Sequence, residues 1–384
     1  MKILFAQKMN GVSGSELYLL QLLPELKARG YDVEMLCFFP RHGDRNKTFV
    51  SHLANYGVKT HEIYEHKSVS PVLARKVAKL IKENKYDLVQ ANLVHADFLL
   101  AMVKTFFCRK MKLLSVKHGF SPAYMAVHGY DFRFLKKDAF YWIERIASRA
   151  IDFNVTISKG LYNVFLEGKV AKPTRLRNIY YGLNLTPPVH ENTSAPIPDF
   201  PYVLITGRLV GFKGHEYLIR SWKKVKELQP GLKLVIAGDG FRRQQLENLT
   251  KEHGLEDVVV FLGHVPNPHS LMEHCLFTTV TSIWEGFGLI LLESWLHKKP
   301  IIAFDVPAMN EVIEDGVSGL LVPLKDETKL AEKIVQLAQD KQKVKDYGEA
   351  GYKRLTEYFN LKRMTDEMEG VYHAMHENKA IPLT

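Results

Sequence analysis

The sequence is poor in cysteine and has no long hydrophobic run. Its three cysteines, Cys37, Cys108 and Cys275, are scattered and lack the spacing of a metal site. This usage favours a reducing compartment and predicts neither a disulfide nor a zinc site. No uncharged stretch reaches the roughly 18 apolar residues that a membrane helix needs, and the opening MKILFA is too short for a signal peptide. We therefore expect a cytoplasmic protein that does not span a membrane.

Acidic residues are scarce in the first half of the chain only. Residues 1–190 contain 29 Lys and Arg against 15 Asp and Glu, whereas residues 191–384 contain 23 against 27. The net charge of +10 therefore comes from the first half. A uniformly basic chain would indicate a nucleic-acid partner. This uneven distribution instead indicates no nucleic acid and a first half that meets an anionic partner or surface.

Two α/β domains are expected, since 384 residues exceed the usual size of one hydrophobic core. Strand-like apolar runs lie at 2–6, 32–39, 87–91, 112–116 and 152–156, and again at 201–206, 232–238, 258–263, 276–282 and 300–304. Helical stretches such as 70–84 separate them, which is typical of parallel sheets. Five prolines between 186 and 201 predict a linker. The predicted fold class is α/β, with two Rossmann-like doubly wound domains facing across a ligand cleft.

Three glycine-containing turns follow predicted strands of the second half, TGRLVGFKG (206–214), IAGDG (236–240) and FLGHVPNPH (261–269). Arg208 and Lys213 precede a helix, a position that suits a phosphate group. A solvated loop could also contain these two cations, and no P-loop pattern is present. Gly238 and Gly240 each could serve only to close a turn. Together the turns describe one rim of a cleft.

The stretch WEGFGLILLESW (284–295) places two acids, Glu285 and Glu293, eight positions apart. The strand at 276–282 puts Glu285 in a loop, and we expect a helix from Gly288 through Glu293 to His297. The amides of Gly288 and Leu289 would form an anion site at the helix start.

These motifs resemble those of the retaining nucleotide-sugar glycosyltransferases of the GT-B fold, often called glycosyl transferases group 1. That group includes bacterial glycan and lipopolysaccharide sugar transferases and sucrose synthases. The Glu-x7-Glu signature appears as EGFGLILLE, followed by SWLHKKPIIAFDVPAMNEVIEDGVSGLLVP. The similarity also includes SGSE, VTISKG, IYYGLNL and GRLVGFKG, so it covers nearly the whole chain.

The resemblance implies a role for each matching residue. Glu293 would bind the ribose hydroxyls and Glu285 the sugar hydroxyls. Arg208 and Lys213 would hold the diphosphate, and His118 would lie beside the reacting sugar. The remaining donor-binding residues are Gly14, Gly238, Val265, Gly286, Phe287, Gly288 and Leu289.

The implied organisation has four parts. Residues 1–185 form the acceptor-side domain, 186–200 the linker, 201–360 the nucleotide-sugar-binding domain, and 361–384 a helix that crosses back to the first domain.

The chain departs from the family at several glycines. Ser13-Gly14 replaces a glycine pair, Lys298 replaces the glycine after the signature helix, and 307–310 replaces a G-G-x-x run. Tyr181 stands where the family has asparagine. Lys298 and Tyr181 are expected to matter little to chemistry, whereas the other two changes touch the donor cleft and bear on the identity of the sugar.

The implied reaction transfers a hexose-type sugar from a UDP- or GDP-sugar to a hydroxyl of a glycan or lipid-linked acceptor, as in surface polysaccharide or lipopolysaccharide synthesis. Preorganised positive charge would stabilise the leaving diphosphate, so we expect no cofactor and no metal. Glu285 and Glu293 are too far apart for the paired carboxyls of a retaining hydrolase. His118 would orient the sugar, although a lone histidine after a strand is often merely packed. Alternatives are a non-catalytic sugar-nucleotide-binding protein and a GT-B epimerase or phosphorylase.

Two stretches of the first half raise the question of a membrane surface. Residues 129–150 combine six aromatic side chains with five Lys and Arg, which suits an anionic bilayer interface with the protein bound peripherally. The other interpretation is a domain helix with Phe140, Ile143 and Ile146 inward, and the two are about equally weighted. Residues 98–112 lie between two strands and are expected to form a core helix.

Overall fold

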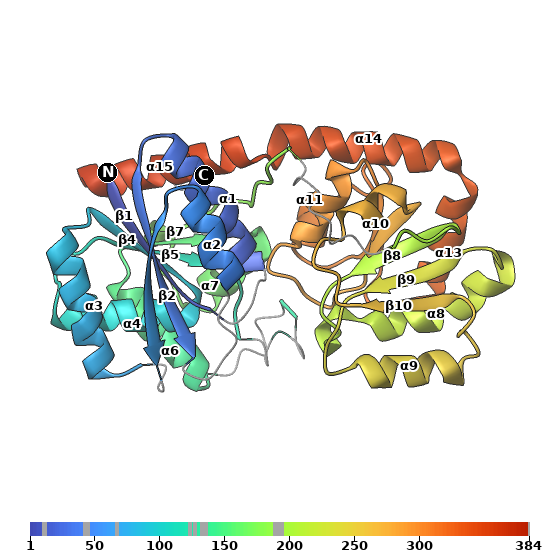
Figure 1. Cartoon of the computed structure of the whole chain (residues 1–384), viewed down its shortest axis with the longest axis horizontal. Coiled ribbons are helices and arrows are strands. Elements are labelled where there is room, and N and C mark those ends of the chain that lie inside the picture. Colours follow the sequence, from blue (N-terminus) through green and yellow to red (C-terminus); the bar gives the residue numbers. More distant parts are fainter. Residues whose placement is uncertain are drawn as a thin grey trace. The chain divides into compact units, whose positions relative to one another are not determined.

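The computed structural model describes residues 1–9, 14–40, 47–65, 69–121, 125, 129–130, 137–186 and 196–382 (Figure 1). The chain divides into two compact units. Unit 1 contains Met1–Gly182 and Leu361–Thr384, and unit 2 contains Leu183–Asn360. Most of the proline-rich segment predicted as a linker lies outside the described residues.

Unit 1 is built on a parallel sheet with the strand order β3-β2-β1-β4-β5-β6-β7. The strands are β1 (Lys2–Lys8), β2 (Asp32–Pro40), β3 (Lys59–Glu65), β4 (Leu88–Asn92), β5 (Leu113–Lys117), β6 (Phe153–Thr156) and β7 (Leu176–Asn178). The five strands predicted in this half are confirmed within one to two residues. Both β3 and β7 were not predicted, because β3 mixes charged with apolar residues and β7 has only three residues.

Helices cover this sheet on the two sides that the crossovers allow. In the described part they are α1 (Gly14–Ala28), α2 (Lys47–Asn55), α3 (Pro71–Asn84), α4 (Leu93–Phe106), α6 (Ala139–Ala150), α7 (Lys159–Glu167), the 3-10 turn η2 (Pro173–Arg175) and α15 (Leu361–Glu377). The start of α3 shows why such boundaries can be read from sequence, since the Ser70 hydroxyl accepts a hydrogen bond from Leu73 N at 3.1 Å and Pro71 opens the helix. The core helix predicted within 98–112 is confirmed as far as Phe106, with Leu99, Leu100 and Val103 fully buried on α4.

Unit 2 has a second parallel sheet, with the order β10-β9-β8-β11-β12-β13. Its strands are β8 (Tyr202–Thr206), β9 (Lys233–Ala237), β10 (Val259–Gly263), β11 (Phe277–Val280), β12 (Ile301–Phe304) and β13 (Leu320–Val322). Five of them confirm the prediction. The short strand β13 was not predicted. The two parallel sheets with crossover helices confirm the predicted fold class of two Rossmann-like domains.

The helical segments described in unit 2 are η3 (Gly211–Lys213), α8 (His215–Leu228), α9 (Arg243–Glu252), α10 (His269–His274), α11 (Leu289–Leu296), α12 (Met309–Val312), α13 (Glu327–Gln339) and α14 (Lys341–Tyr358). Long helix α14 ends at Tyr358, and Asn360 is the last residue of the unit. The signature helix α11 is apolar throughout except for Glu293 and Ser294, so it packs as an element buried on several sides.

The last helix, α15, belongs to unit 1 although the chain reaches it from unit 2. It buries Met364, Met368 and Val371 against unit 1. The Tyr372 hydroxyl donates to Gln90 Oε1 in β4 at 2.7 Å, and both side chains are fully buried. These contacts make α15 part of the first unit's core.

For residues 129–150, of which 131–136 lie outside the described residues, the interpretation as a domain helix with Phe140, Ile143 and Ile146 inward is wrong for two of these three residues. Ile143 and Ile146 are 36% and 53% exposed. The buried side of α6 contains Glu144 instead, because the buried Lys117 ammonium pairs with this carboxylate at 2.9 Å. Within the ranges that the structure describes, no helix is long and apolar enough to cross a membrane.

Candidate functional site

The carboxyl ends of β8, β9 and β10 are joined by backbone contacts between their loops. Gly207 N donates to Ala237 O at 3.0 Å, and Gly238 N donates to Gly263 O at 2.7 Å. A Cβ atom placed on Gly238 would lie 1.8 Å from Gly207 O. Glycine at 238 is therefore required for the two loops to pack, whatever contact it also makes with a ligand.

The loop before α8 is pressed against the loop after β11. Gly214 has φ of 65°, and a Cβ there would lie 2.0 Å from Thr281 O. The Thr281 hydroxyl donates to Lys213 O at 3.1 Å, and Ile283 N donates to Phe212 O at 2.7 Å. These contacts fix the backbone that carries Lys213 beside the backbone that carries Glu285.

At this junction the Lys213 ammonium forms an ion pair with the Glu285 carboxylate. The Ser282 hydroxyl donates to the same oxygen, Glu285 Oε1, at 2.7 Å. The two charged side chains are only 20% and 12% exposed. The predicted phosphate-binding lysine and the predicted sugar-binding acid thus lie together, whereas Arg208 is exposed at the end of β8.

Helix α11 begins as predicted, with Gly288 as its N-cap at φ 88° and Leu289 as its first residue. The positive φ favours glycine at this position, where a Cβ would lie 2.6 Å from the terminal methyl of Met309. The first amides of a helix have no partner inside the helix and carry the positive end of its dipole. Gly286 and Phe287 form the turn that leads into this helix start, and Phe287 is buried.

Glu293 lies one turn further along α11 and is partly buried. Burial raises the pKa of its carboxyl to about 7, and the nearby Lys213 opposes this rise. The two acids of the signature therefore differ in environment. Glu285 has a cation and a hydroxyl as direct partners, whereas Glu293 is held in an apolar helix near the same cation.

The loop after β10 adds an apolar surface to this edge of the sheet. Val265 and Ile290 are partly buried and pack against one hydrophobic cluster. The members of that cluster are Tyr202, Leu204, Val235, Ala237, Leu271, Met272 and Cys275. An apolar side chain at the end of β10 suits the flat face of a base.

Unit 1 carries the other two predicted site residues, Gly14 and His118. Gly14 is the first residue of α1, and residues 10–13 before it, including Ser13, lie outside the described residues. Next to it, Gln7 Nε2 donates to Ser15 Oγ at 3.2 Å and to Glu16 Oε1 at 2.7 Å, all three being buried. This network fixes the start of α1 on the end of β1.

His118 follows β5 and is held by hydrogen bonds at both ring nitrogens. Its Nε2 lies 3.2 Å from Asn92 Oδ1, an acceptor, so Nε2 carries the proton and Nδ1 accepts from the Tyr181 hydroxyl. Tyr18 stacks on Tyr181 with ring centroids 5.2 Å apart and meets His118 edge-on. Burial, with the neighbouring Lys117 cation, lowers the pKa of His118 to about 3, so the ring is neutral. This contact of Tyr181 was not predicted from the sequence.

A buried charge network next to His118 was also missed. Lys117 Nζ lies 2.6 Å from Asp97 and 2.9 Å from Glu144, and the three side chains are at most 2% exposed. Asp97 also accepts from Ser115 Oγ at 2.5 Å. Burial lowers the pKa of Lys117, but Asp97 and Glu144 outweigh it and raise the pKa overall. The network ties α4 and α6 to β5, and the only sequence signal was a lysine at the end of an apolar strand.

At two positions where this chain lacks the glycine of the family it resembles, the backbone has a positive φ angle. Lys298 has φ of 55°, and Ala308, which is fully buried, has φ of 74° with ψ of −45°. Non-glycine residues adopt such angles at a cost in free energy. The chain therefore keeps the glycine conformation at both places without the glycine.

Comparisons with known proteins agree with this geometry. Residues 12–186 match the model of Glycosyltransferase Family 4, and residues 190–354 match that of Glycosyl transferases group 1. An alpha-D-kanosaminyltransferase of Streptomyces kanamyceticus is 31% identical over 181 residues, 46% of either chain. A Campylobacter jejuni protein is 31% identical over 169 residues, 44% of this chain and 46% of its own. Its name is N-acetylgalactosamine-N,N'-diacetylbacillosaminyl-diphospho-undecaprenol 4-alpha-N-acetylgalactosaminyltransferase. The matches span about half the length of these relatives.

Among solved structures, HepE of Anabaena in complex with UDP-glucose superposes with a TM-score of 0.78. The two are 21% identical, and the match covers 97% of this chain and all of HepE. Two parallel Rossmann-like sheets and this similarity define the GT-B fold of glycosyltransferases. Within that class, the chain consists of a Glycosyltransferase Family 4 domain followed by a Glycosyl transferases group 1 domain.

Proposed function

We propose that this protein is a retaining glycosyltransferase that moves a hexose from a UDP- or GDP-sugar to a hydroxyl of a glycan or lipid-linked acceptor. The observation that carries the proposal is the Lys213–Glu285 ion pair next to the start of α11. A cation, the amides at the start of a helix and a partly buried Glu293 lie at the carboxyl edge of the unit 2 sheet, where such sheets bind ligands. The HepE structures that share the fold contain UDP and UDP-glucose, which supports a nucleotide-sugar donor.

Unit 2 would hold the donor through contacts along this edge. Lys213, Arg208 and the amides of Gly288 and Leu289 would bind the diphosphate. Glu293 would accept hydrogen bonds from the ribose hydroxyls and Glu285 from the sugar, while Val265 would lie against the base. Gly238 keeps the loops at the required spacing.

In the proposed transfer, a bond forms between the acceptor oxygen and the anomeric carbon while the bond from that carbon to the diphosphate oxygen breaks. The electron pair stays on the diphosphate, whose growing negative charge is stabilised by Lys213 and Arg208. A diphosphate oxygen takes the proton of the attacking hydroxyl, so no protein base is needed. From unit 1, His118 would lie beside the donor sugar as a neutral ring whose orientation is held by Asn92 and Tyr181, consistent with its lowered pKa.

The acceptor is proposed to be linked to lipid or to surface polysaccharide, in lipopolysaccharide or related synthesis. Helix α6 exposes Trp142, Ile143 and Ile146 by 45%, 36% and 53%. Arg149 is exposed on the same helix, and the Arg145 guanidinium lies over the Trp142 ring at 5.9 Å. An apolar stripe with cations suits the interface of an anionic bilayer. The Campylobacter jejuni relative, whose name includes diphospho-undecaprenol, supports this class of acceptor.

The proposed contact of α6 with an anionic bilayer is tested by comparing vesicle binding of wild type and the double variant Trp142→Ser/Ile146→Ser. Flotation with neutral and anionic vesicles should recover wild type only with anionic vesicles, and the variant with neither. Equal recovery on both vesicle types would contradict it.

The donor assignment is tested by thermal shift with UDP-, GDP- and ADP-sugars. A ligand bound only by the folded protein raises the melting temperature, by a free energy of about 2.7 kcal/mol at a hundred times its Kd. We expect a shift with a UDP- or GDP-sugar and its loss in Glu293→Ala.

Transfer should then be assayed with and without EDTA, and we expect equal rates. Loss of transfer in EDTA with recovery on adding magnesium or manganese would contradict the metal-independent mechanism.

The assay also separates the alternatives. A non-catalytic binding protein would show the thermal shift without product. An epimerase would convert the sugar nucleotide without any acceptor, and a phosphorylase would need inorganic phosphate.

A further inference from the structure

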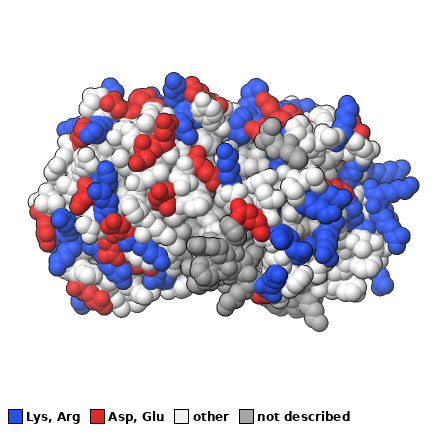
Figure 2. All heavy atoms as spheres, turned by 180° about the vertical axis from the view of Figure 1, so that it is seen from behind, with Lys and Arg blue, Asp and Glu red and all other residues white. Residues whose placement is uncertain are grey.

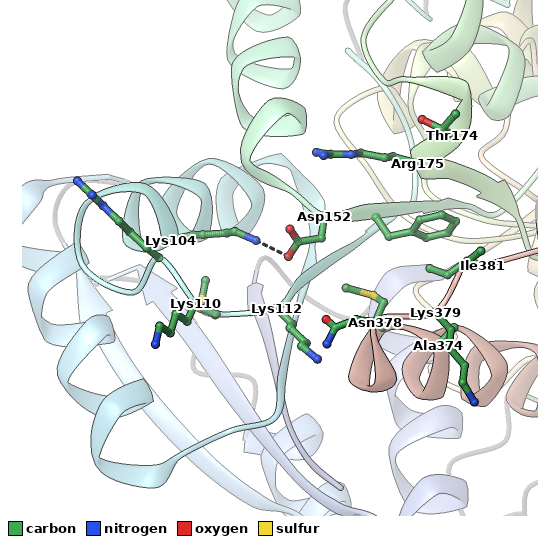
Figure 3. A pocket seen from close by; sticks show the side chains of 15 residues that line it. Lys104, Lys110, Lys112, Asp152, Thr174, Arg175, Ala374, Asn378, Lys379 and Ile381 are labelled. Atoms are coloured by element: carbon green, nitrogen blue, oxygen red, sulfur yellow. Dashed lines mark hydrogen bonds and ion pairs between the residues drawn. The ribbon is translucent and has the colours of Figure 1, made fainter.

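A cavity of about 470 Å³ opens on unit 1 at the edge of the sheet opposite to His118 (Figure 3). Lys112, Asp152 and Arg175 line it, and each immediately precedes a strand, namely β5, β6 and β7. His118 instead follows the end of β5. Six residue steps of extended chain place Lys112 and His118 about 20 Å apart. The cavity is therefore separate from the residues proposed to serve transfer.

The lining of this cavity is strongly cationic. Six of its fifteen residues are Lys or Arg, and Asp152 is its single carboxylate. The cationic residues are Lys104, Arg109, Lys110, Lys112, Arg175 and Lys379. Figure 3 shows Lys110, Lys112, Arg175 and Lys379 arranged around the pair of Lys104 and Asp152. On the face drawn in Figure 2, the side occupied by unit 1 likewise carries many more Lys and Arg than Asp and Glu.

Asp152 does not neutralise this charge, because its carboxylate is already used. Its Oδ2 atom pairs with the Lys104 ammonium and accepts a hydrogen bond from Leu113 N at 2.8 Å. Lys379 pairs with Glu377 at 2.6 Å on the surface. Among the described residues, no carboxylate pairs with Arg109, Lys110 or Arg175. Like charges gathered in one concavity repel one another, and a bound anion would remove that repulsion.

Hydrogen bonds hold part of the cavity lining in place. The Lys112 ammonium donates to His376 O, near the end of α15, at 2.5 Å. After α15, Lys379 N donates to Ala374 O at 2.8 Å, and Asn378 takes a left-handed φ of 57°. The backbone of the C-terminal segment is therefore fixed against the loop before β5. Part of the positive charge is oriented before any ligand arrives.

We propose that this cavity binds a phosphate-bearing group at a site separate from the donor site. Two guanidinium groups suit phosphate oxygens, which they bind in pairs, and the volume exceeds one phosphate, which favours a diphosphate or a phosphate with an attached group. The group comes either from a free anion or from a lipid headgroup. The proposal does not depend on the transfer reaction.

The test compares two triple variants with the same loss of charge. Arg109→Gln/Lys110→Gln/Arg175→Gln removes three cations of the cavity. Arg75→Gln/Lys76→Gln/Lys79→Gln removes three exposed cations of α3 and is the matched control. All substituted side chains are exposed, so both variants should fold and should keep the wild-type melting temperature in chloride buffer.

The first arm measures binding of inorganic phosphate and diphosphate by calorimetry and thermal shift at constant ionic strength. Because the sugar nucleotide is absent, failure here says nothing about the donor site. For a free anion, we expect wild type and control to bind equally and the cavity variant at least about tenfold more weakly. A UDP titration of all three proteins should give equal affinities, since the proposed donor contacts along the unit 2 sheet involve none of the substituted residues.

The second arm measures flotation with phosphatidylcholine vesicles that contain or lack phosphatidylglycerol. A headgroup site predicts no binding of free phosphate, with recovery on the anionic vesicles that is lost in the cavity variant and kept in the control. If the cavity and control variants behave alike in both arms, or if wild type binds neither anion nor vesicle, the proposal is overturned.

Discussion

The Lys213 ammonium and the Glu285 carboxylate form an ion pair across 72 positions of sequence. The pair joins the loop after β8 to the loop after β11, and Ser282 supports it with a hydrogen bond to Glu285. Each partner thus fixes the orientation of the other. Neither can be replaced without changing the charge that a donor diphosphate would meet.

Lys213→Ala should lower kcat by about a hundredfold, because it removes preorganised positive charge from the leaving group. Glu285→Ala should also slow transfer, and the double variant should lose less than the product of the single losses, since the two side chains interact directly. Lys224→Ala, an exposed lysine of α8, is the control and should match wild type. Steady-state kinetics of the four variants measures this coupling. Strictly multiplicative losses would show that the pair does not act as a unit.

Glu293 should make stability depend on pH. With a folded pKa of about 7 against a usual value of 4.5, the folded state holds a proton that the unfolded state has released between these values. Stability therefore falls as pH rises from about 4.5 to 7, by at most about 3 kcal/mol. Glu293→Gln should lose this dependence and be more stable than wild type above pH 7. Urea unfolding at pH 5 and pH 8 measures the difference, and parallel curves for both proteins would contradict it.

Glu293→Gln should change stability and donor binding in opposite directions. Above pH 7 the ionised Glu293 would accept hydrogen bonds from ribose hydroxyls, which the neutral Gln amide accepts more weakly. Glu293→Gln should therefore be more stable yet bind the donor less tightly, with a raised KM and a smaller change in kcat. Glu293→Ala should show the same loss of donor binding. A variant with wild-type KM would leave Glu293 without a donor contact.

Tyr181→Phe should affect transfer through His118. It removes the hydroxyl that donates to His118 Nδ1 and leaves that buried nitrogen without its partner, at about 1–2 kcal/mol of stability. A reoriented ring should lower kcat by about tenfold with little change in donor KM. Tyr162→Phe on α7 serves as the control. Lower stability with unchanged kcat would assign Tyr181 a packing role only.

Replacing Lys298 and Ala308 by glycine should stabilise the protein. Each residue has a positive φ angle, so each substitution relieves backbone strain and should contribute about 0.5–1 kcal/mol. The matched control is Ala303→Gly in β12, another fully buried alanine, which should destabilise by about 1 kcal/mol. Thermal unfolding measures all three. Equal destabilisation by Ala308→Gly and Ala303→Gly would show that the angle at 308 is not strained.

The strands and the signature helix could be predicted because their signals are local. Apolar runs ended by glycine turns located ten strands, and Gly288 marked the start of α11. The charged strand β3 and the three-residue strands β7 and β13 lacked such signals. For α6 the hydrophobic pattern misled, because Glu144 turns inward to Lys117, a partner 27 positions away.

The contacts of the candidate site that the sequence did not predict join residues that are far apart in the chain. The residue types at 213, 285 and 293 were readable from motifs, but the pairing of Lys213 with Glu285 depends on the packing of Gly214 against Thr281. The contact of Tyr181 with His118 spans 63 positions. No pattern in the sequence connects such pairs, since only the folded sheet order brings them together.

Because α15 belongs to unit 1, the ribosome supplies the last residues of unit 1 only after it has synthesised all of unit 2. Strand β4 leaves the ribosome with Gln90 more than 280 residues ahead of its partner Tyr372. At 5–20 residues per second, the 190 residues from Leu183 to Tyr372 take about 10–40 s to synthesise. During that interval unit 1 lacks part of its core, whereas unit 2 is a continuous segment that is complete at Asn360. The second unit to be synthesised is thus the first to have all of its residues.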